Sequence, residues 1–447
     1  MSTTPDRVVI TGFGVISPFG LGADALYEGM LAGETRVAAL PEPRASLRPG
    51  YGAAISERPA KIIRKLPASR EMRPGTMTRY TFLSTAALGD AMLNANVPLG
   101  NEEGRKDLVP PWEGSKRRGA YIASYTNSDK FDKYVRFAHH VIARKGDGVA
   151  IDDSQVPDAI RKFTAFEFLK LMNNMPTAHA GIQGRCRGPV NTFLGTPAGG
   201  VQAIGRAYEA IRDDLADVMY AGGVGSSVHD QMMMVRATRG LSSSPDVDPA
   251  AAGRPFDKAA TGIVPGEGGG MLVLERASTA EARGATVKAE LLGYGDWFTA
   301  PVSNRGLPPG PGGMVRAARK AMKAAGIEAS EIDLVTALGE SDVELDAIEA
   351  AGFAELLGPR ASEVPILSLT AHVGACEAGI GPMAAAVAML AMERGQVPGD
   401  LNREDPIDGY TGPSSAAPRT MDVRTVLVSV MTREGINAAL VLRRPEA

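Results

Sequence analysis

Cysteine is scarce in this sequence of 447 residues, which contains two, Cys186 and Cys376. Two cysteines cannot build a disulfide framework or a cysteine-based metal site, so we expect a reducing cytoplasm and no bound metal. No apolar run approaches the roughly 18–20 residues of a membrane span, and the first residues lack the pattern of a signal peptide. The formal net charge of −3 argues against a nucleic-acid partner. The sequence predicts a cytoplasmic protein that contacts neither membranes nor nucleic acid, and we expect no cofactor.

The bulk composition is that of an ordinary globular protein, with 44% hydrophobic and 22% charged residues. The length allows two domains or one duplicated domain. The 52 glycines and 31 prolines are scattered among periodic segments, which is typical of many tight turns rather than of disorder. The chain is therefore long enough to bury a large core.

The stretch from Gly188 to Gly205 predicts a strand, a sharp turn and the first turn of a helix. Such an elbow holds a reactive side chain at the positive end of a helix dipole, where a thiolate or an oxyanion is favoured. The turn carries Pro197, which suits a helix start because its fixed φ is already helical. Proline has no nucleophilic atom. The elbow thus has the shape for a nucleophile but lacks the reactive group.

Strands and helices alternate along the chain, which favours an α/β fold with buried sheets. The first half predicts strands at 7–10 and 118–124 and helices at 22–31 and 81–93. The second half predicts strands at 287–293, 332–336, 365–369, 425–430 and 437–443 and helices at 313–325, 342–356 and 379–394. We therefore predict a duplicated fold with halves at 1–284 and 285–447. The first half carries an excursion at about 125–165 with helices of its own.

Several motifs in a fixed order connect the chain to one family. They are Arg7–Gly12 with Gly20, Gly188–Pro189 with Ala203–Gly205, Ala216–Asp217 with Ala221–Gly223, and Arg254–Asp257 followed by Gly266–Gly268. With these motifs the chain resembles, over nearly its whole length, the β-ketoacyl-[acyl-carrier-protein] synthases of the thiolase-like superfamily. The resemblance implies a thiolase-like, duplicated αβαβα five-layer fold.

The resemblance also implies where catalytic groups should stand. The family's cysteine nucleophile falls on Pro197, and its first histidine falls on Leu338. The second histidine is kept as His372, but the lysine five residues earlier is matched by Leu367. Near the C-terminus the family's glycine-rich loop is replaced by residues 429–437, of which only Asn437 matches. Without the thiolate and with one histidine missing, no recognisable route to Claisen condensation remains.

These losses are similar to those of the family's chain-length-factor or ketosynthase-β subunits. We predict a non-catalytic subunit that forms a heterodimer with a catalytic β-ketoacyl-acyl-carrier-protein synthase in type II polyketide or fatty-acid-like biosynthesis and shapes the acyl tunnel. The candidates for lining that tunnel are Thr196, Pro197, Leu338, His372 and Asn437. The sequence specifies neither the product nor its chain length.

Two other hypotheses stay open. One is an acyltransferase or thioesterase with relocated chemistry, which uses Thr196, Cys376 or a nucleophile of the substrate, with His372 as the base. The other is a homodimeric acyl-binding or scaffold protein without catalysis. For Cys376 the simpler interpretation is a small buried apolar residue.

A basic segment runs from Lys61 to Arg79, and Arg64, Lys65, Arg70 and Arg73 are its docking candidates. A solvated charged face is one interpretation. The other is a docking surface for an acidic partner such as an acyl carrier protein, attracted by charge.

Overall fold

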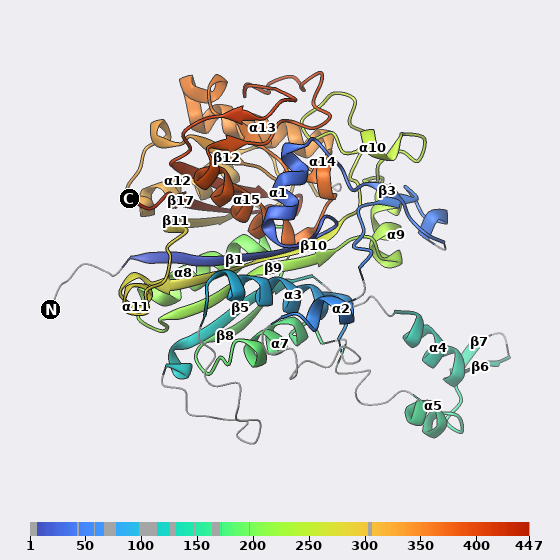
Figure 1. Ribbon diagram of the computed structural model, residues 1–447. Helices are drawn as coiled ribbons and strands as arrows, with labels where there is room; N and C mark the ends of the chain where they lie inside the picture. Colours follow the sequence, from blue (N-terminus) through green and yellow to red (C-terminus); the bar gives the residue numbers. More distant parts are fainter. Residues whose placement is uncertain are drawn as a thin grey trace.

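The computed structural model in Figure 1 shows a layered α/β protein with a projecting arm. It describes residues 7–42, 44–57, 59–66, 77–97, 114–125, 131–146, 148–162, 170, 172–195, 197–302 and 306–446. Within these ranges no helix is both long and apolar enough to cross a membrane.

The two halves of the chain each form a set of five strands with the same topology. The first half contributes β1 (Val8–Ser17), β5 (Arg118–Ser124), β8 (Val190–Leu194), β9 (Val218–Ser226) and β10 (Glu267–Arg276), in the spatial order β8-β5-β9-β10-β1. The second contributes β11 (Ala289–Phe298), β12 (Leu334–Thr336), β13 (Ile366–Leu367), β16 (Thr425–Met431) and β17 (Ile436–Arg443), in the order β13-β12-β16-β17-β11.

The pairing directions repeat as well. In each half the first two strand pairs in these orders are parallel and the last two are antiparallel. Short pairing of β1 with β11 joins the two sets into one sheet. Repetition of both order and direction indicates a duplicated unit.

Helices form the other layers. The central helices are α8 (Gly199–Arg212) and α15 (Ile380–Arg394), which pack against strands of both halves; α15 is buried from Ile380 to Met392. The outer helices are α3 (Arg79–Asn94) and α7 (Met175–Gln183) on the first sheet and α12 (Gly312–Ala325) and α13 (Val343–Leu357) on the second half. The predicted thiolase-like αβαβα layering is confirmed (Figure 1).

The remaining elements of the described ranges are short. They are β2 (Gly20–Leu21), α1 (Ala23–Leu31), β3 (Ala38–Ala39), β4 (Tyr51–Gly52), α2 (Pro59–Ile63), α9 (Asp230–Thr238), α10 (Pro249–Ala252), α11 (Ala277–Ala282), α14 (Thr370–Val373), β14 (Gln396–Val397) and β15 (Arg419–Thr420). Among them, α1 packs against α15 and β1. Short 3-10 turns occur at Arg44–Ser46, Ser115–Arg117, Ala329–Glu331, Gly358–Ser362 and Glu377–Gly379.

Most predicted elements are confirmed to within two or three residues, and the strand at 118–124 coincides with β5. The first strand is longer than predicted, because it continues past Ile10 through a glycine-containing stretch to Ser17. Glycine is required there by close packing on α3: a Cβ at Gly14 would lie 2.2 Å from the carbonyl oxygen of Ala87. The glycines of this stretch let the helix approach the strand closely.

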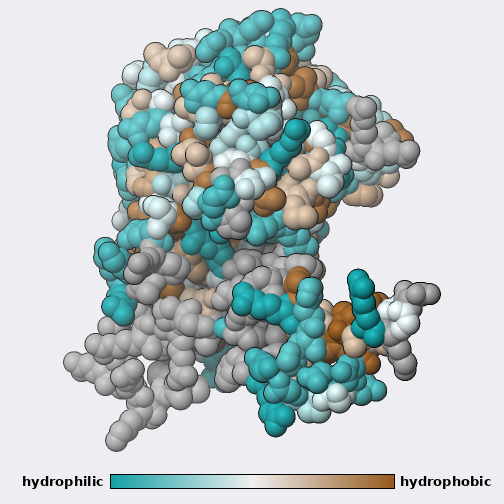
Figure 2. Space-filling view, turned by 90° about the vertical axis from the view of Figure 1, so that its right-hand side faces the viewer, coloured by the Kyte–Doolittle hydropathy of each residue, from teal (hydrophilic) through white to brown (hydrophobic). Residues whose placement is uncertain are grey.

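A projecting arm, which we define as residues 131–162, falls within the range of about 125–165 for which the sequence predicts an excursion. It contains α4 (Phe131–Val141), β6 (Ile142–Lys145), β7 (Gly148–Ile151) and α5 (Val156–Lys162). In the space-filling view the arm stands out from the body at the lower right and carries a group of brown, hydrophobic residues (Figure 2). Its exposed apolar side chains include Val135, Ile142, Val149, Ile151 and Ile160. Such a group on a protrusion is typical of a surface that meets a partner.

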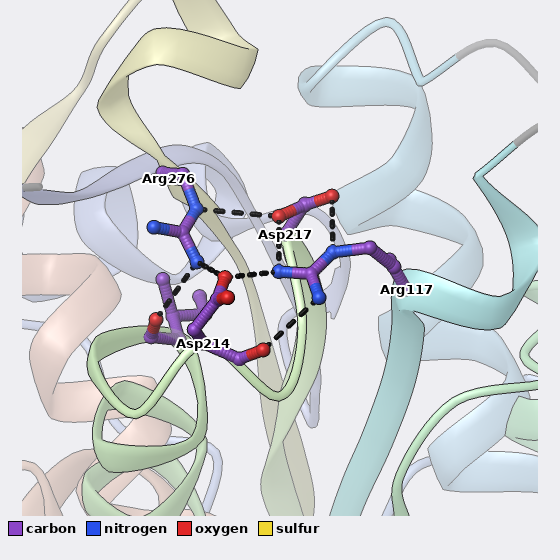
Figure 3. A network of polar contacts seen from close by, with 5 residues as sticks. Arg117, Asp214, Asp217 and Arg276 are labelled. Carbon is purple, nitrogen blue, oxygen red and sulfur yellow. Dashed lines mark hydrogen bonds and ion pairs between the residues drawn. The ribbon is translucent and has the colours of Figure 1, made fainter. Parts of the chain in front are cut away.

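A network of charges ties together three strands of the first half (Figure 3). Asp217, directly before β9, accepts from Arg117 Nε at 2.7 Å and from Arg276 Nε at 3.2 Å. The same two arginines reach the Asp214 carboxylate. Hydrogen bonding by Arg117 lowers the pKa of Asp217. The network lies where β5 and β9 begin, and because β8 runs parallel to β5, the elbow after β8 lies at the opposite end.

Candidate functional site

The predicted elbow is present at the start of α8. Strand β8 ends at Leu194, the Gly195 N–H donates to the Ser124 carbonyl oxygen at 3.1 Å, and α8 begins at Gly199. Pro197 lies buried in the turn two residues before the helix. Thr196 lies outside the described residues. The described part of this turn offers no nucleophilic side chain.

The segment Cys376–Ala378 packs tightly against the first turn of α8. A Cβ at Gly200 would lie 2.1 Å from the Ala378 carbonyl oxygen, and a Cβ at Gly223 of β9 would lie 2.2 Å from the same atom. Only glycine allows this approach at either position. The segment before α15 is thereby fixed against the elbow.

Leu338 follows β12 in a loop that two buried carboxylates hold. Its N–H and that of Gly339 each donate to the Glu349 carboxylate at 2.9 Å. The next two N–H groups, of Glu340 and Ser341, donate to Asp346 at 3.0 and 3.1 Å. The Leu338 side chain itself is buried in the hydrophobic core. The backbone at Leu338 is therefore held by hydrogen bonds to buried carboxylates, but its side chain cannot donate a hydrogen bond.

His372 lies buried in α14. Its Nδ1 is 2.7 Å from the Glu34 carbonyl oxygen, and its own carbonyl accepts from the Arg36 N–H at 2.9 Å. Burial lowers the pKa of His372 to about 4, so the ring is neutral at pH 7 and Nδ1 donates to Glu34. Within the described ranges, Nε2 has no partner and no hydrogen bond runs from the ring to the elbow. Leu367 is buried in β13.

Cys376 is also buried. Its thiol donates to the Val373 carbonyl oxygen at 3.4 Å. Burial raises the pKa of this thiol well above its usual range. A buried thiol held in its protonated form is a poor nucleophile.

The turn that replaces the glycine-rich loop carries Arg433 into the interior. Arg433 Nη2 donates to Asp342 Oδ1 at 2.8 Å and to Glu344 Oε2 at 3.0 Å, and Nε also bonds Asp342. Glu434 remains exposed. Asn437 is buried and donates to the carbonyl oxygens of Trp297 and Gly435. This turn is thus tied to the loop that carries Leu338.

Sequence reasoning missed a group of buried charges beside the elbow, which we call the polar cluster: Arg236, Glu340 and Glu377. Arg236 Nη2 donates to Glu377 Oε1 at 2.6 Å, and all three side chains are at most 7% exposed. Burial raises the pKa of Glu340 to about 8. Only a weak signal for burial of these three side chains is present in the sequence. Arg236 follows an apolar run, and Glu340 and Glu377 stand among small residues.

The docking candidates fall into two groups. Arg64 and Lys65 follow α2 and are exposed. Arg70 and Arg73 lie outside the described residues. No group of three or more His, Cys, Asp and Glu side chains in the described ranges is arranged to hold a metal ion.

Comparisons with known proteins identify relatives of the chain. Residues 5–280 match the family model of the beta-ketoacyl synthase N-terminal domain, and residues 288–404 match that of the C-terminal domain. The chain is 31% identical to a protein of Streptomyces violaceoruber named as granaticin polyketide beta-ketoacyl synthase 2, over 98% of this chain and 97% of that one. It is 28% identical to 3-oxoacyl-[acyl-carrier-protein] synthase 2 of Rhizobium meliloti, over 98% and 99% of the two chains.

Among solved structures, the chain is similar to one titled the ishigamide ketosynthase/chain length factor. The TM-score is 0.80 with 23% identity, over 99% of this chain and all of that one. At this identity the likeness concerns the fold.

Proposed function

The chain belongs to the β-ketoacyl synthase family, and from this premise we propose that it is a non-catalytic, chain-length-factor-type subunit. In this role it pairs with a catalytic β-ketoacyl synthase and shapes the acyl tunnel of the pair. The observation that carries the proposal is Pro197, buried in an intact elbow where the family resemblance assigns the cysteine nucleophile.

Besides the nucleophile, the chain lacks the first histidine and the lysine that the family resemblance assigns to catalysis. Leu338 stands on a backbone held by Glu349, so the position is preserved while the imidazole is missing. Leu367 replaces the lysine and is buried in apolar surroundings. Acyl transfer needs a nucleophile, and enolate formation needs hydrogen-bond donors. These changes favour a subunit that binds a partner and shapes the acyl tunnel over a subunit that catalyses a reaction.

A partner surface is available at the β8 edge of the sheet. Strand β8 pairs with β5 on one side, and no other described strand pairs with its second side. Val190 and Leu194, at the two ends of β8, are 48% and 66% exposed. Exposed edge strands are usually covered, because their free backbone groups invite pairing. A partner subunit that adds its own strand here would cover both the edge and its apolar side chains.

The pairing is tested by co-expression with the catalytic ketosynthase of the same biosynthetic locus. We expect a stable heterodimer in size-exclusion chromatography with light scattering. The double variant Val190→Lys/Leu194→Lys should release the partner. Leu215→Lys is the matched control, because Leu215 is 57% exposed but lies in the turn between α8 and β9, away from the unpaired edge of β8. Persistent homodimers with no affinity for a ketosynthase would overturn the proposal.

An acyl carrier protein is the second proposed partner. Exposed Arg64 and Lys65 lie on one basic segment, and opposite charges speed the encounter of such partners. Reversing both charges with Arg64→Glu/Lys65→Glu should weaken binding of the carrier protein, measured by surface plasmon resonance at low salt. Unchanged affinity would remove this segment from the docking surface.

Relocated acyl transfer through His372 receives less support. Its ring is neutral and donates to a backbone carbonyl, and the neighbouring Cys376 thiol donates to Val373. Neither arrangement pairs a nucleophile with a base. Intact-mass measurement after incubation with acyl- and malonyl-carrier protein should find no covalent adduct; an adduct on Thr196 or Cys376 would favour the enzyme.

A further inference from the structure

We propose that Arg236 and Glu340 of the polar cluster form a recognition site for the oxygen atoms of an oxygenated, β-ketoacyl chain, in preference to a saturated acyl chain. This inference rests on the proposed function, because it assigns the substrate class that the subunit accommodates.

The site lies beside the elbow. Glu377 precedes Ala378, whose carbonyl oxygen packs against the first turn of α8, and a Cβ at Gly225 of β9 would lie 2.5 Å from the Glu377 Cβ. Glu340 stands two residues after Leu338, on the loop held by Asp346 and Glu349. Arg236 comes from α9 and bonds Glu377. Three segments distant in sequence thus bring these ionisable side chains close enough to interact, beside the elbow.

Two polar atoms of the site are buried without a partner. Arg236 uses Nη2 for Glu377, while Nη1 makes no hydrogen bond; Glu340 Oε1 makes none either. A buried polar atom without a partner destabilises the protein, so nearly all such atoms in proteins find one. Oxygen atoms of a ligand would supply acceptors for both groups, whereas methylene groups would leave both unpaired.

The charge state of Glu340 suits this role. Burial raises its pKa to about 8, the charges of Glu377, Asp342 and Glu434 act in the same direction, and the charge of Arg236 opposes them. At pH 7 the carboxyl group is therefore protonated and able to donate. A guanidinium N–H and a carboxylic O–H are then two donors, and each can bond a carbonyl oxygen of a β-ketoacyl chain.

Backbone strain is concentrated at the same place. Glu377 has φ of 49° and Ser341, next to Glu340, has φ of 63°. Non-glycine residues seldom adopt this left-handed conformation, and where they do they often hold a functional group in place.

The test compares two hydrolysis-resistant pantetheine probes of equal chain length. One carries carbonyl groups on alternate carbons of the chain, and the other is saturated. Isothermal titration calorimetry on the full chain, alone and with its ketosynthase, should give a preference of roughly tenfold for the keto probe, about the effect of one unpaired buried donor. Glu340→Leu should abolish the preference, and Glu340→Gln, which can still donate, should retain most of it.

Two further measurements keep the result specific. Asp217→Asn, in the network at the far end of the sheet, should leave the preference unchanged. In the wild type the preference should fall as the pH rises through about 8, because Glu340 then loses its donor; Glu340→Gln should show no such fall. Equal affinity for both probes, no binding of either, or an unchanged preference in Glu340→Leu would overturn the inference. Heterodimer formation in the same samples reports on the proposed function separately.

Discussion

Arg433 and Asp342 form a buried ion pair between segments 91 residues apart in the chain. Both side chains are 6% exposed, and Arg433 Nη2 lies 2.8 Å from Asp342 Oδ1 while Nε bonds the other carboxylate oxygen. Asp342 also caps the first turn of α13. The pair therefore connects the turn after β16 to the loop that carries Leu338 and Glu340.

Removing one member of this pair should be strongly destabilising. Arg433→Met leaves the Asp342 carboxylate buried without its guanidinium, which typically lowers the free energy of unfolding by about 3–5 kcal/mol. Urea denaturation followed by circular dichroism measures the loss.

Two controls separate pairing from mere loss of a charge. The double variant Arg433→Met/Asp342→Asn removes the buried charge as well and should recover part of the stability. Arg424→Met breaks an exposed ion pair, in which Arg424 Nε lies 2.8 Å from Asp422 Oδ2 and the two side chains are 71% and 56% exposed. This variant should lower the free energy of unfolding by at most about 1 kcal/mol. Equal losses in Arg433→Met and Arg424→Met would contradict the prediction.

The network around Asp217 should contribute stability that disappears in acid. Hydrogen bonding by Arg117 lowers the pKa of Asp217 below its usual value of 3.8. The contribution is therefore present above about pH 4 and is lost as the pH falls through the lowered pKa. Asp217→Asn should lower the free energy of unfolding by about 1–2 kcal/mol near neutral pH, since the pairs are partly exposed, and by less at lower pH. A difference in the free energy of unfolding between Asp217→Asn and the wild type that stays constant down to about pH 2 would count against this role.

Much of the fold follows from local patterns. The alternation of strands and helices indicates the duplication, and the motif spacing places Pro197 on the elbow and Leu338 on its loop without structural information. Arg236, Glu340 and Glu377 could not be found in the same way, because α9, the loop after β12 and the segment before α15 meet only in the folded chain. In sequence each resembles an ordinary solvated charge, and only burial distinguishes it.

Glu340 should make stability depend on pH in the opposite direction from Asp217. Its pKa is raised, chiefly by burial, from 4.5 to about 8, so the folded chain keeps a proton that the unfolded chain releases. Rising pH across this window lowers the free energy of unfolding of the wild type. Glu340→Gln cannot ionise, so its stability relative to the wild type should increase between about pH 5 and pH 9. A constant difference over that range would mean that Glu340 is already ionised in the folded protein.

Restoring the missing cysteine should not restore catalysis. In Pro197→Cys the thiol would stand before α8, whose dipole favours a thiolate, yet Leu338 cannot donate a hydrogen bond to a developing oxyanion. We therefore expect at most acyl transfer from acyl-carrier protein to the introduced thiol, seen by intact mass, and no β-keto product from malonyl-carrier protein. Leu194→Cys, on the exposed end of β8, controls for acylation of any accessible thiol. A condensation product from the single variant would show that Pro197 alone silences the site, and the chain would then be a ketosynthase that lacks only its nucleophile rather than a subunit selected for its surface.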